Sequence, residues 1–259
     1  MATTKLRELY HVLGWCSTDT QQAICTDLLR AKKSDPRGIK VARLFQDALK
    51  QMQAFDAQEV PFVPKSRKNT KGTNPVTTVM STQQQIEVKV GHVETYSFQY
   101  LNREIPHLRT ATADEAEGKA WIDCVGISDK KRPVVFEIKC EADKNVFYGF
   151  IQLLTYLSEL ATKNQMSRSQ KAKLFGNWDG NCAQHDLVIL LANSKHAGKK
   201  QSLANDTVTL AKGFAKCLEL DPFEEAARVV GNIACLSCTI DEKKSVFSDS
   251  LKTEWFIPR

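Results

Sequence analysis

The stretch from residue 121 to residue 156 constrains the fold most, because charged residues interrupt its apolar segments. It reads WIDCVGISDKKRPVVFEIKCEADKNVFYGFIQLLTY. Residues 120–128 and 133–140 are rich in β-branched and apolar residues and flank the polar turn SDKKR, which predicts two consecutive strands. Residues 144–161 repeat apolar side chains at helical spacing and predict a helix. The stretch therefore predicts a strand–strand–helix unit that carries its own charged residues.

Three charged residues lie on the predicted strands, with Asp123 on the first and Glu137 and Lys139 on the second. Glu137 and Lys139 are two residues apart, so they project from the same strand face. The other face holds residues expected in the core: Phe136, Ile138 and Cys140. On adjacent strands, Asp123 would lie beside Glu137, so that both carboxylates reach one divalent ion. The alternative is an exposed ion pair between Glu137 and Lys139, with Asp123 as a surface charge near a turn.

Two carboxylates beside a lysine suit the hydrolysis of phosphodiester bonds. Mg²⁺ prefers oxygen ligands, is usually held by one or two carboxylates and keeps several waters. A bound metal ion stabilises charge that grows on the phosphate and lowers the pKa of its water. A neighbouring lysine can position that water, act as a base or stabilise the developing charge. The residue types therefore favour a metal-dependent site on the predicted strands.

The helix that follows adds Gln152 and Tyr156, which are four residues apart and share one helix face. With this pair included, the chain resembles the PD-(D/E)XK nuclease superfamily, and within it the branch of RecB-type and lambda-exonuclease-type nucleases. The resemblance covers about residues 90–195. Its motif is carried by Asp123, Glu137-Ile138-Lys139 and Gln152-x-x-x-Tyr156.

The resemblance implies a restriction-endonuclease-like α-β-β-β-α-β core and a nuclease that uses Mg²⁺ or Mn²⁺ to cleave DNA. It implies that the carboxylates of Asp123 and Glu137 and the backbone carbonyl of Ile138 hold the metal ion. The sequence departs from the superfamily motif at one place, because Ile122 rather than proline precedes Asp123.

The remaining motif residues receive roles from the same resemblance. Lys139 would engage the attacking water. Gln152 would orient the site through its amide, and Tyr156 would hydrogen-bond a phosphate oxygen. The alternative for Gln152 and Tyr156 is a contact at the rim of the helix.

The superfamily branch also uses an acidic residue on the helix before the first core strand. Residues 91–103 (HVETYSFQYLNRE) are predicted to form that helix, which would end before Pro106. Glu94 is the best match to the acidic residue, and it would ligate the metal ion or orient a metal-bound water. Three further acids compete for this role: Glu104, Glu115 and Glu117.

The other segments predict an α/β fold with a mixed sheet. Strands are expected at 107–113, at 185–192, at 229–240 and near the C-terminal WFIPR, and a helix at 202–220. The run VILLA within 185–192 is typical of a buried central strand. From residue 91 onward, helices and strands interleave, which predicts a mixed sheet flanked by helices.

The chain is predicted to have three parts. Residues 1–56 form a helical N-terminal region, in which the run from Ser17 to Gln22 offers N-cap residues for the second helix. Residues 57–88 form a basic linker, because prolines, Gly72 and basic residues break any periodicity. Residues 89–259 form the nuclease-like domain. The N-terminal helices fit either a helix-turn-helix that reads DNA or a cap that contacts a partner protein or a second copy of the chain.

The net charge of +6 gives a mild bias toward polyanions. Basic residues without acids cluster at 61–75, at 163–173 and at 195–200. The second cluster is expected to hold DNA phosphates without reading sequence, and each cluster alone also fits a solvated loop. That cluster consists of Lys163, Arg168, Lys171 and Lys173.

The eight cysteines are expected to be reduced thiols in a cytoplasmic protein, because no secretory leader is recognisable. Cys235 and Cys238 lie three apart on a predicted strand and would point to opposite faces, which favours buried thiols over a metal site. No apolar run reaches about 18 residues, so no membrane span is expected. His107 and His185 are expected to be structural rather than catalytic.

Two functions of different classes fit these patterns. The first is a Mg²⁺- or Mn²⁺-dependent deoxyribonuclease. The alternative is a catalytically inactive nuclease-fold module that binds nucleic acid or a partner protein.

Overall fold

The computed structural model describes residues 4–54, 74–83, 85–90, 94–106, 121–140, 145–192, 201–241 and 246–259. These residues form a seven-stranded sheet in the order β1-β2-β3-β4-β5-β6-β9. Its strands are β1 (Ile86–Val90), β2 (Glu94–Pro106), β3 (Trp121–Ser128), β4 (Pro133–Cys140), β5 (His185–Ala192), β6 (Val230–Cys238) and β9 (Lys252–Ile257). A two-stranded ladder of β7 (Ile240–Asp241) and β8 (Val246–Phe247) lies beside it.

The sheet is mixed, and the pairing changes at β4. The strands from β1 to β4 are antiparallel to their neighbours, β4, β5 and β6 are parallel, and β9 returns antiparallel to β6. A parallel pair needs a crossover connection. The crossovers contain α5 (Val146–Leu160) with α6 (Lys163–Lys171), and then α7 (Gln201–Cys217) with α8 (Glu224–Val229). The predicted α/β class with a mixed sheet is confirmed.

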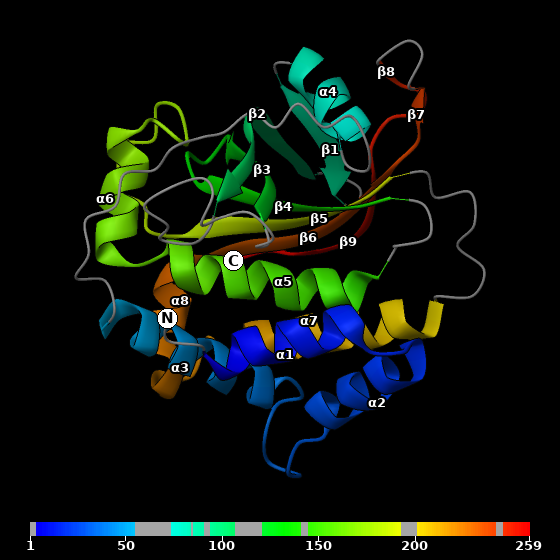
Figure 1. Ribbon diagram of the computed structural model, residues 1–259, viewed down its shortest axis with the longest axis vertical. Helices are drawn as coiled ribbons and strands as arrows, with labels where there is room; N and C mark the ends of the chain where they lie inside the picture. The colour runs from blue at the N-terminus through cyan, green and yellow to red at the C-terminus, as the bar shows by residue number, and fades with distance from the viewer. Residues whose placement is uncertain are drawn as a thin grey trace.

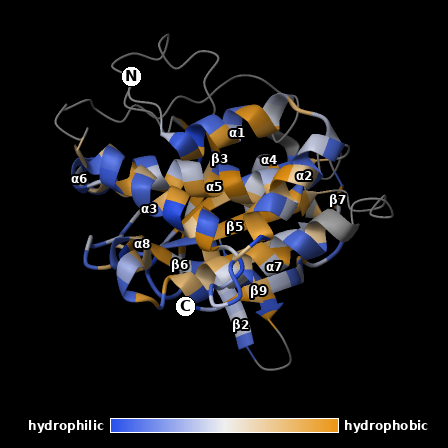
Figure 2. Cartoon of the chain, turned by 90° about the horizontal axis from the view of Figure 1, so that it is seen from below, coloured by the Kyte–Doolittle hydropathy of each residue, from blue (hydrophilic) through white to orange (hydrophobic). Residues whose placement is uncertain are grey.

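One face of the sheet carries a thick helical layer, in which α1 (Lys5–Trp15), α2 (Thr18–Leu29) and α3 (Ile39–Ala54) lie beside α5 and α7 (Figure 1). Figure 2 shows hydrophobic residues concentrated on α5, in the middle of this layer, and alternating with hydrophilic residues on the helices around it. A single hydrophobic core joins Leu6, Phe45, Phe150, Leu187 and Phe214. The N-terminal helices are therefore built into the same core as the crossover helices.

The opposite face is covered by α4 (Asn74–Thr82) and by the coiling of the sheet itself. A second core there contains Met80, Phe98 and Phe136. The outer strands β1 and β9 approach each other, since the Thr253 hydroxyl donates to the carbonyl of Lys89 at 2.7 Å. The predicted linker 57–88 thus contributes α4 and β1 to the folded structure.

Most elements predicted from the sequence are confirmed, including β3, β4, α5, β5, α7, β6 and the C-terminal edge strand β9. The predicted cap is also present, because the Ser17 side chain accepts the N–H of Thr20 at 3.3 Å. Cys235 faces the first core and Cys238 faces the second, so the two thiols point to opposite sides as predicted. The strand predicted at 107–113 lies outside the described residues.

The helix predicted at 91–103 is wrong, because residues 94–103, the described part of this segment, belong to strand β2. Tyr96 and Phe98 are both buried in the second core, two residues apart, as a strand requires. Aromatic residues at alternate positions favour a strand. Pro106 is the last residue of β2 that the structure describes.

Among the described residues, no helix combines the length and the apolar character needed to cross a membrane.

Candidate active site

Strands β3 and β4 part at Asp123, and this opening begins the candidate site. Their ladder ends at the pair of Cys124 and Phe136. One residue further, the Asp123 Oδ2 atom accepts the backbone N–H of Ile138 at 2.7 Å. A carboxylate thus takes the place of a strand carbonyl and fixes Asp123 against β4, beside Glu137. Asp123 is half-buried here and is not a surface charge near a turn.

Glu137 and Lys139 project from β4 toward the helical layer. The two residues are 2% and 4% exposed, and Lys139 Nζ lies 2.8 Å from Glu137 Oε1. Helix α5 crosses directly above them at Gly149, where a Cβ atom would meet Lys139 Cε at 3.5 Å and Glu137 Cγ at 3.7 Å. The predicted shared face is confirmed, and the alternative of an exposed ion pair is wrong.

Gln152 and Tyr156 extend this pair into a chain of polar contacts along α5. Lys139 Nζ donates to Gln152 Oε1 at 3.0 Å. Because an ammonium group can only donate hydrogen bonds, the oxygen of the Gln152 amide must face Lys139. The other side of that amide donates to the Tyr156 hydroxyl. Both side chains are buried, so they are parts of the interior rather than contacts at the helix rim.

Burial and negative charge keep the hydroxyl and thiol groups near the site protonated. The pKa of Tyr156 is raised well above its usual range, mainly by burial and then by the charge of Glu137. The pKa of the Cys124 thiol is raised for the same reasons, with Asp123 and Glu137 as the neighbouring charges. Tyr156 can therefore serve as a hydrogen-bond donor, and Cys124 is not a nucleophile.

Two tyrosines that the sequence reading missed complete the surroundings of Lys139. The Lys139 ammonium lies 4.5 Å from the centre of the Tyr148 ring. Tyr10 of α1 stacks on Tyr148, with ring centres 5.5 Å apart and planes 9° from parallel, and meets Tyr156 edge-on at 6.2 Å. Tyr148 precedes Gln152 by four residues, and this spacing alone predicts that the two side chains share one helix face. Nothing in the sequence near Tyr10 indicates its contact with Tyr148.

Helix α1 closes the site on the side of the helical layer. Arg7 Nε donates to Glu159 Oε1 at 2.7 Å, and both residues are buried. Arg7 and Tyr10 are one turn apart on α1, while Glu159 and Tyr156 are one turn apart on α5. The two helices are therefore held together by an ion pair and by ring contacts directly beside the Lys139 cluster.

The structure does not bring Glu94 to the site. Glu94 begins β2 and pairs with Val90 of β1, and it is exposed. In the ladder between β2 and β3, Arg103 pairs with Cys124 and Ile105 pairs with Ile122. The backbone register therefore places position 104, rather than position 94, opposite Asp123.

Two of the other acids proposed for this role, Glu115 and Glu117, lie outside the described residues. The same holds for His107 and for the basic clusters at 61–75 and 195–200, apart from the α4 residues at the end of the first.

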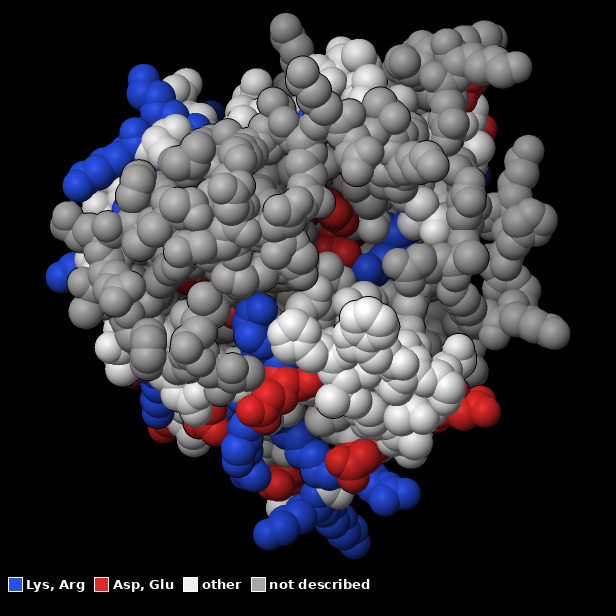
Figure 3. Space-filling model, viewed as in Figure 1, with Lys and Arg blue, Asp and Glu red and all other residues white. Residues whose placement is uncertain are grey.

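The basic cluster on and after α6 lies on the surface. Lys163, Lys171 and Lys173 are exposed, and half-buried Arg168 donates to Gln165 Oε1 at 3.2 Å. The α6 sequence, KNQMSRSQK, contains no acid. Figure 3 shows basic side chains at the upper left of the molecule, where Figure 1 places α6. These side chains form a positively charged surface on and after α6.

The oxygen donors at the β3–β4 opening fit a hard divalent cation. Asp123 and Glu137 supply carboxylates from neighbouring strands, with the Ile138 backbone between them. Within the described part of the chain, no group of three or more His, Cys, Asp or Glu side chains could hold a metal ion. Mg²⁺ needs only one or two carboxylates because it keeps several waters. Lys139 would compete with such an ion for Glu137.

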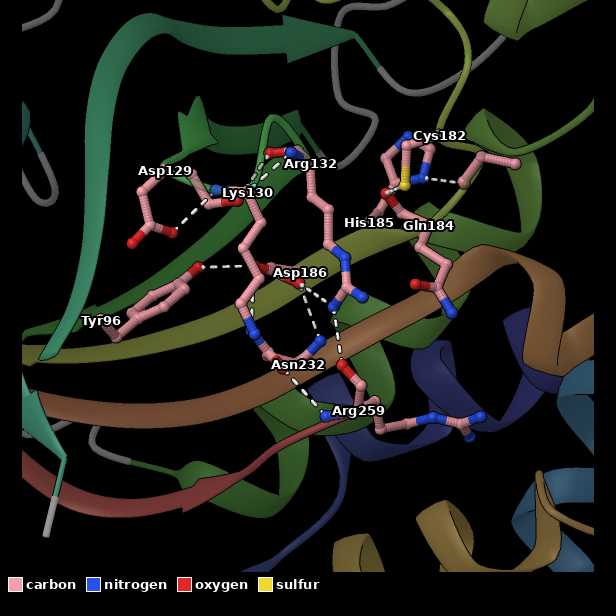
Figure 4. Close-up of polar contacts among 12 residues, drawn as sticks. Tyr96, Asp129, Lys130, Arg132, Cys182, Gln184, His185, Asp186, Asn232 and Arg259 are labelled. Atoms are coloured by element: carbon pink, nitrogen blue, oxygen red, sulfur yellow. Dashed lines mark hydrogen bonds and ion pairs between the residues drawn. The ribbon is translucent and has the colours of Figure 1, made fainter. Parts of the chain in front are cut away.

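A second buried carboxylate lies at the opposite end of the parallel strands, on β5 (Figure 4). Asp186 accepts the backbone N–H of Asn232 at 2.8 Å and the hydroxyl of Tyr96 at 3.1 Å, and it lies 3.7 Å from Arg132 Nη1. Arg132 in turn donates to the carbonyl of Arg259 at 2.9 Å. No sequence pattern pointed to this cluster.

His185 is buried next to Asp186, and its ring contacts the rings of Phe175 and Trp178. Its Nδ1 atom lies 2.9 Å from the carbonyl of Ala183. Burial lowers the pKa of His185 to about 4, so the ring is neutral at physiological pH. These contacts agree with the predicted structural role.

No protein-family model matches the chain, and no match is found among curated proteins or among solved structures.

Proposed function

We propose that this protein is a Mg²⁺- or Mn²⁺-dependent nuclease that hydrolyses phosphodiester bonds of DNA. The observation that carries the proposal is the placement of Asp123 against Ile138, which sets a second carboxylate beside Glu137 and Lys139 at the point where two strands part. The two carboxylates supply oxygen ligands for one hard metal ion, and the Lys139 ammonium lies next to them.

The order of elements supports the same proposal. Strands β2, β3 and β4, helix α5 and strand β5 follow one another in the β-β-β-α-β order implied by the superfamily resemblance. The motif residues lie on β3, β4 and α5. The segment directly before β2 is strand β1 rather than the helix that the resemblance implies, with α4 before it.

Each residue has a role that its contacts allow. Asp123 and Glu137 would hold the metal ion, together with the Ile138 carbonyl. When bound, the ion would stabilise charge on the phosphate and acidify its water. Lys139 is held beside the carboxylates, where its charge can orient a water or stabilise developing negative charge.

Gln152 and Tyr156 act behind Lys139. Gln152 anchors the ammonium through its amide oxygen, and Tyr156 anchors the amide. Tyr156 is fully buried, so we assign it to this anchoring rather than to a phosphate contact. The exposed lysines on and after α6 would hold the nucleic-acid backbone.

The test is cleavage of plasmid, linear and single-stranded DNA by purified protein with Mg²⁺ or Mn²⁺. Asp123→Ala and Lys139→Ala are compared with Lys216→Ala, which removes an exposed lysine of α7 outside the site and outside the basic cluster. We expect the first two variants to lose cleavage and the third to keep most of it. Full activity in Asp123→Ala and Lys139→Ala would refute the site.

A non-catalytic module that binds nucleic acid or a partner protein is the second candidate. It is favoured by the ammonium of Lys139, which already neutralises Glu137, and by the closure of the site by α1. It predicts salt-dependent DNA binding without cleavage in any metal. Calorimetry with Mn²⁺ separates the two, because an intact acidic site binds the ion and Asp123→Asn abolishes the binding.

A further inference from the structure

Tyr148 is the residue beside Lys139 that neither the motif nor the proposed nuclease chemistry assigns. Its half-buried ring lies on the same face of α5 as Gln152, one turn earlier. Among the described residues, the electron-rich neighbours of the Lys139 ammonium include Glu137 Oε1 at 2.8 Å, Gln152 Oε1 at 3.0 Å and the Tyr148 ring at 4.5 Å.

We propose that Tyr148 is a positioning residue for Lys139, and that Tyr10 of α1 holds the Tyr148 ring in place. The catalytic consequence rests on the proposed nuclease function. The positioning itself does not, because it follows from the contacts of the ammonium.

The need for such a residue follows from the competition for Glu137. A divalent ion bound to Glu137 would take the carboxylate that now holds Lys139 and would repel the ammonium. Gln152 and the Tyr148 ring would then be the neighbours that still attract it. The face of an aromatic ring attracts an ammonium through its quadrupole, and the attraction is strongest where water is excluded.

The Tyr148 ring is itself fixed from two sides. Asn145 caps α5 by accepting the N–H of Tyr148 at 2.9 Å, which sets the backbone. Tyr10 stacks on the ring from α1. Gly14, one turn further along α1, leaves room for the Tyr148 hydroxyl, since a Cβ atom there would lie 3.1 Å from it. This gives the N-terminal helix a role in the site.

The experiment compares Tyr148→Phe, which keeps the ring, with Tyr148→Leu, which removes it. Lys139 is labelled with acetic anhydride, and the modified peptide is quantified by mass spectrometry against the exposed Lys163 in the same sample. We expect labelling of Lys139 to rise about tenfold in Tyr148→Leu and to stay within about twofold in Tyr148→Phe. Tyr10→Leu should shift the labelling in the same direction by a smaller factor.

Phe150→Leu is the matched control, because it loosens the same helix through its contact with Phe214 and not through Lys139. Equal labelling of Lys139 in the Leu and Phe variants at position 148, or an equal rise in Phe150→Leu, would overturn the proposal.

Cleavage kinetics give the second readout. We expect kcat to fall in Tyr148→Leu with KM unchanged, and Tyr148→Phe to restore kcat. A labelling shift in a protein that cleaves no DNA would leave the positioning role intact and reject the nuclease function. If the protein cleaves DNA but Tyr148→Leu changes neither the labelling of Lys139 nor kcat, the nuclease function stands and the positioning role is rejected.

Discussion

Glu137 on β4 and Asp186 on β5 are both buried carboxylates on neighbouring parallel strands, but they are held differently. Asp186 accepts a backbone N–H of β6 and a tyrosine hydroxyl of β2, and it faces the guanidinium of Arg132. Glu137 contacts the ammonium of Lys139 on its own strand, and that long side chain also reaches Gln152.

Asp186 is therefore suited to a structural role, whereas Glu137 is suited to exchange Lys139 for another partner. Moving Asp186 would leave the Asn232 N–H on β6 and the Tyr96 hydroxyl on β2 without this acceptor, each at a cost of about 1–3 kcal/mol. Lys139 keeps two other attractive neighbours if Glu137 turns to a metal ion. We therefore expect substitutions at Asp186 to reduce stability and substitutions at Glu137 to reduce activity.

The largest expected effect is on cleavage by the Glu137→Gln variant. Loss of the charge should lower the rate by about 10³-fold, as expected for a group that stabilises transition-state charge. The free energy of unfolding should fall by less than the about 3 kcal/mol expected for Asp186→Asn, because the new amide oxygen still accepts the Lys139 ammonium. Steady-state cleavage and urea unfolding measure the two quantities, and a large loss of stability would break the comparison.

Asp186→Asn should show the opposite pattern. One oxygen becomes a donor facing the donors of Asn232 and Tyr96, so the free energy of unfolding should fall by about 3 kcal/mol. Asp129→Asn, in the exposed turn before Arg132, is the control and should stay within about 0.5 kcal/mol. Urea unfolding checks both, and cleavage per folded molecule should be unchanged in each. Equal stability of the two variants would contradict the role of Asp186.

His185, beside Asp186, predicts a loss of stability in acid. Its pKa lies near 4 in the folded protein, below the usual 6.5, because burial disfavours the charged ring. As the pH falls from about 6.5 to about 4, the unfolded chain binds a proton that the folded chain does not, so stability falls by about 3 kcal/mol.

Unfolding measured across this pH range should show a shallower dependence in His185→Gln than in the natural protein. His11→Gln, which removes an exposed histidine, should keep the natural dependence. Identical pH curves for His185→Gln and the natural protein would reject the buried neutral ring.

The smallest effect is expected at Gly149, above Glu137 and Lys139. A methyl group there meets its neighbours at 3.5 Å, which is ordinary contact, so Gly149→Ala should raise the free energy of unfolding by up to about 1 kcal/mol. Gly213→Ala on α7 is the contrasting variant, because its Cβ would lie 1.5 Å from the Arg37 carbonyl oxygen. Thermal unfolding compares the two variants. A destabilised Gly149→Ala would show that α5 lies too close to Glu137 and Lys139 to accommodate a methyl group.

Local patterns predicted much of this site. Glu137 and Lys139 share a face because a strand alternates, and Gln152 and Tyr156 share one because a helix repeats every 3.6 residues. The helix predicted at 91–103 is wrong because Tyr96 and Phe98, at alternate positions, indicate a strand rather than a helix. The predicted helix also placed the upstream acid at Glu94, whereas the β2–β3 register brings position 104 opposite Asp123.

The sequence by itself determined the strands, the crossover helix and the faces that their polar residues share, because these depend on residues two to four positions apart. Only the tertiary structure decided that β3 leaves β4 at Asp123 and that α1 brings Tyr10 to Tyr148. It also decided that Asp186 meets groups from three other segments. Those contacts join residues up to about 140 positions apart, and they depend on how the whole core packs rather than on any local period.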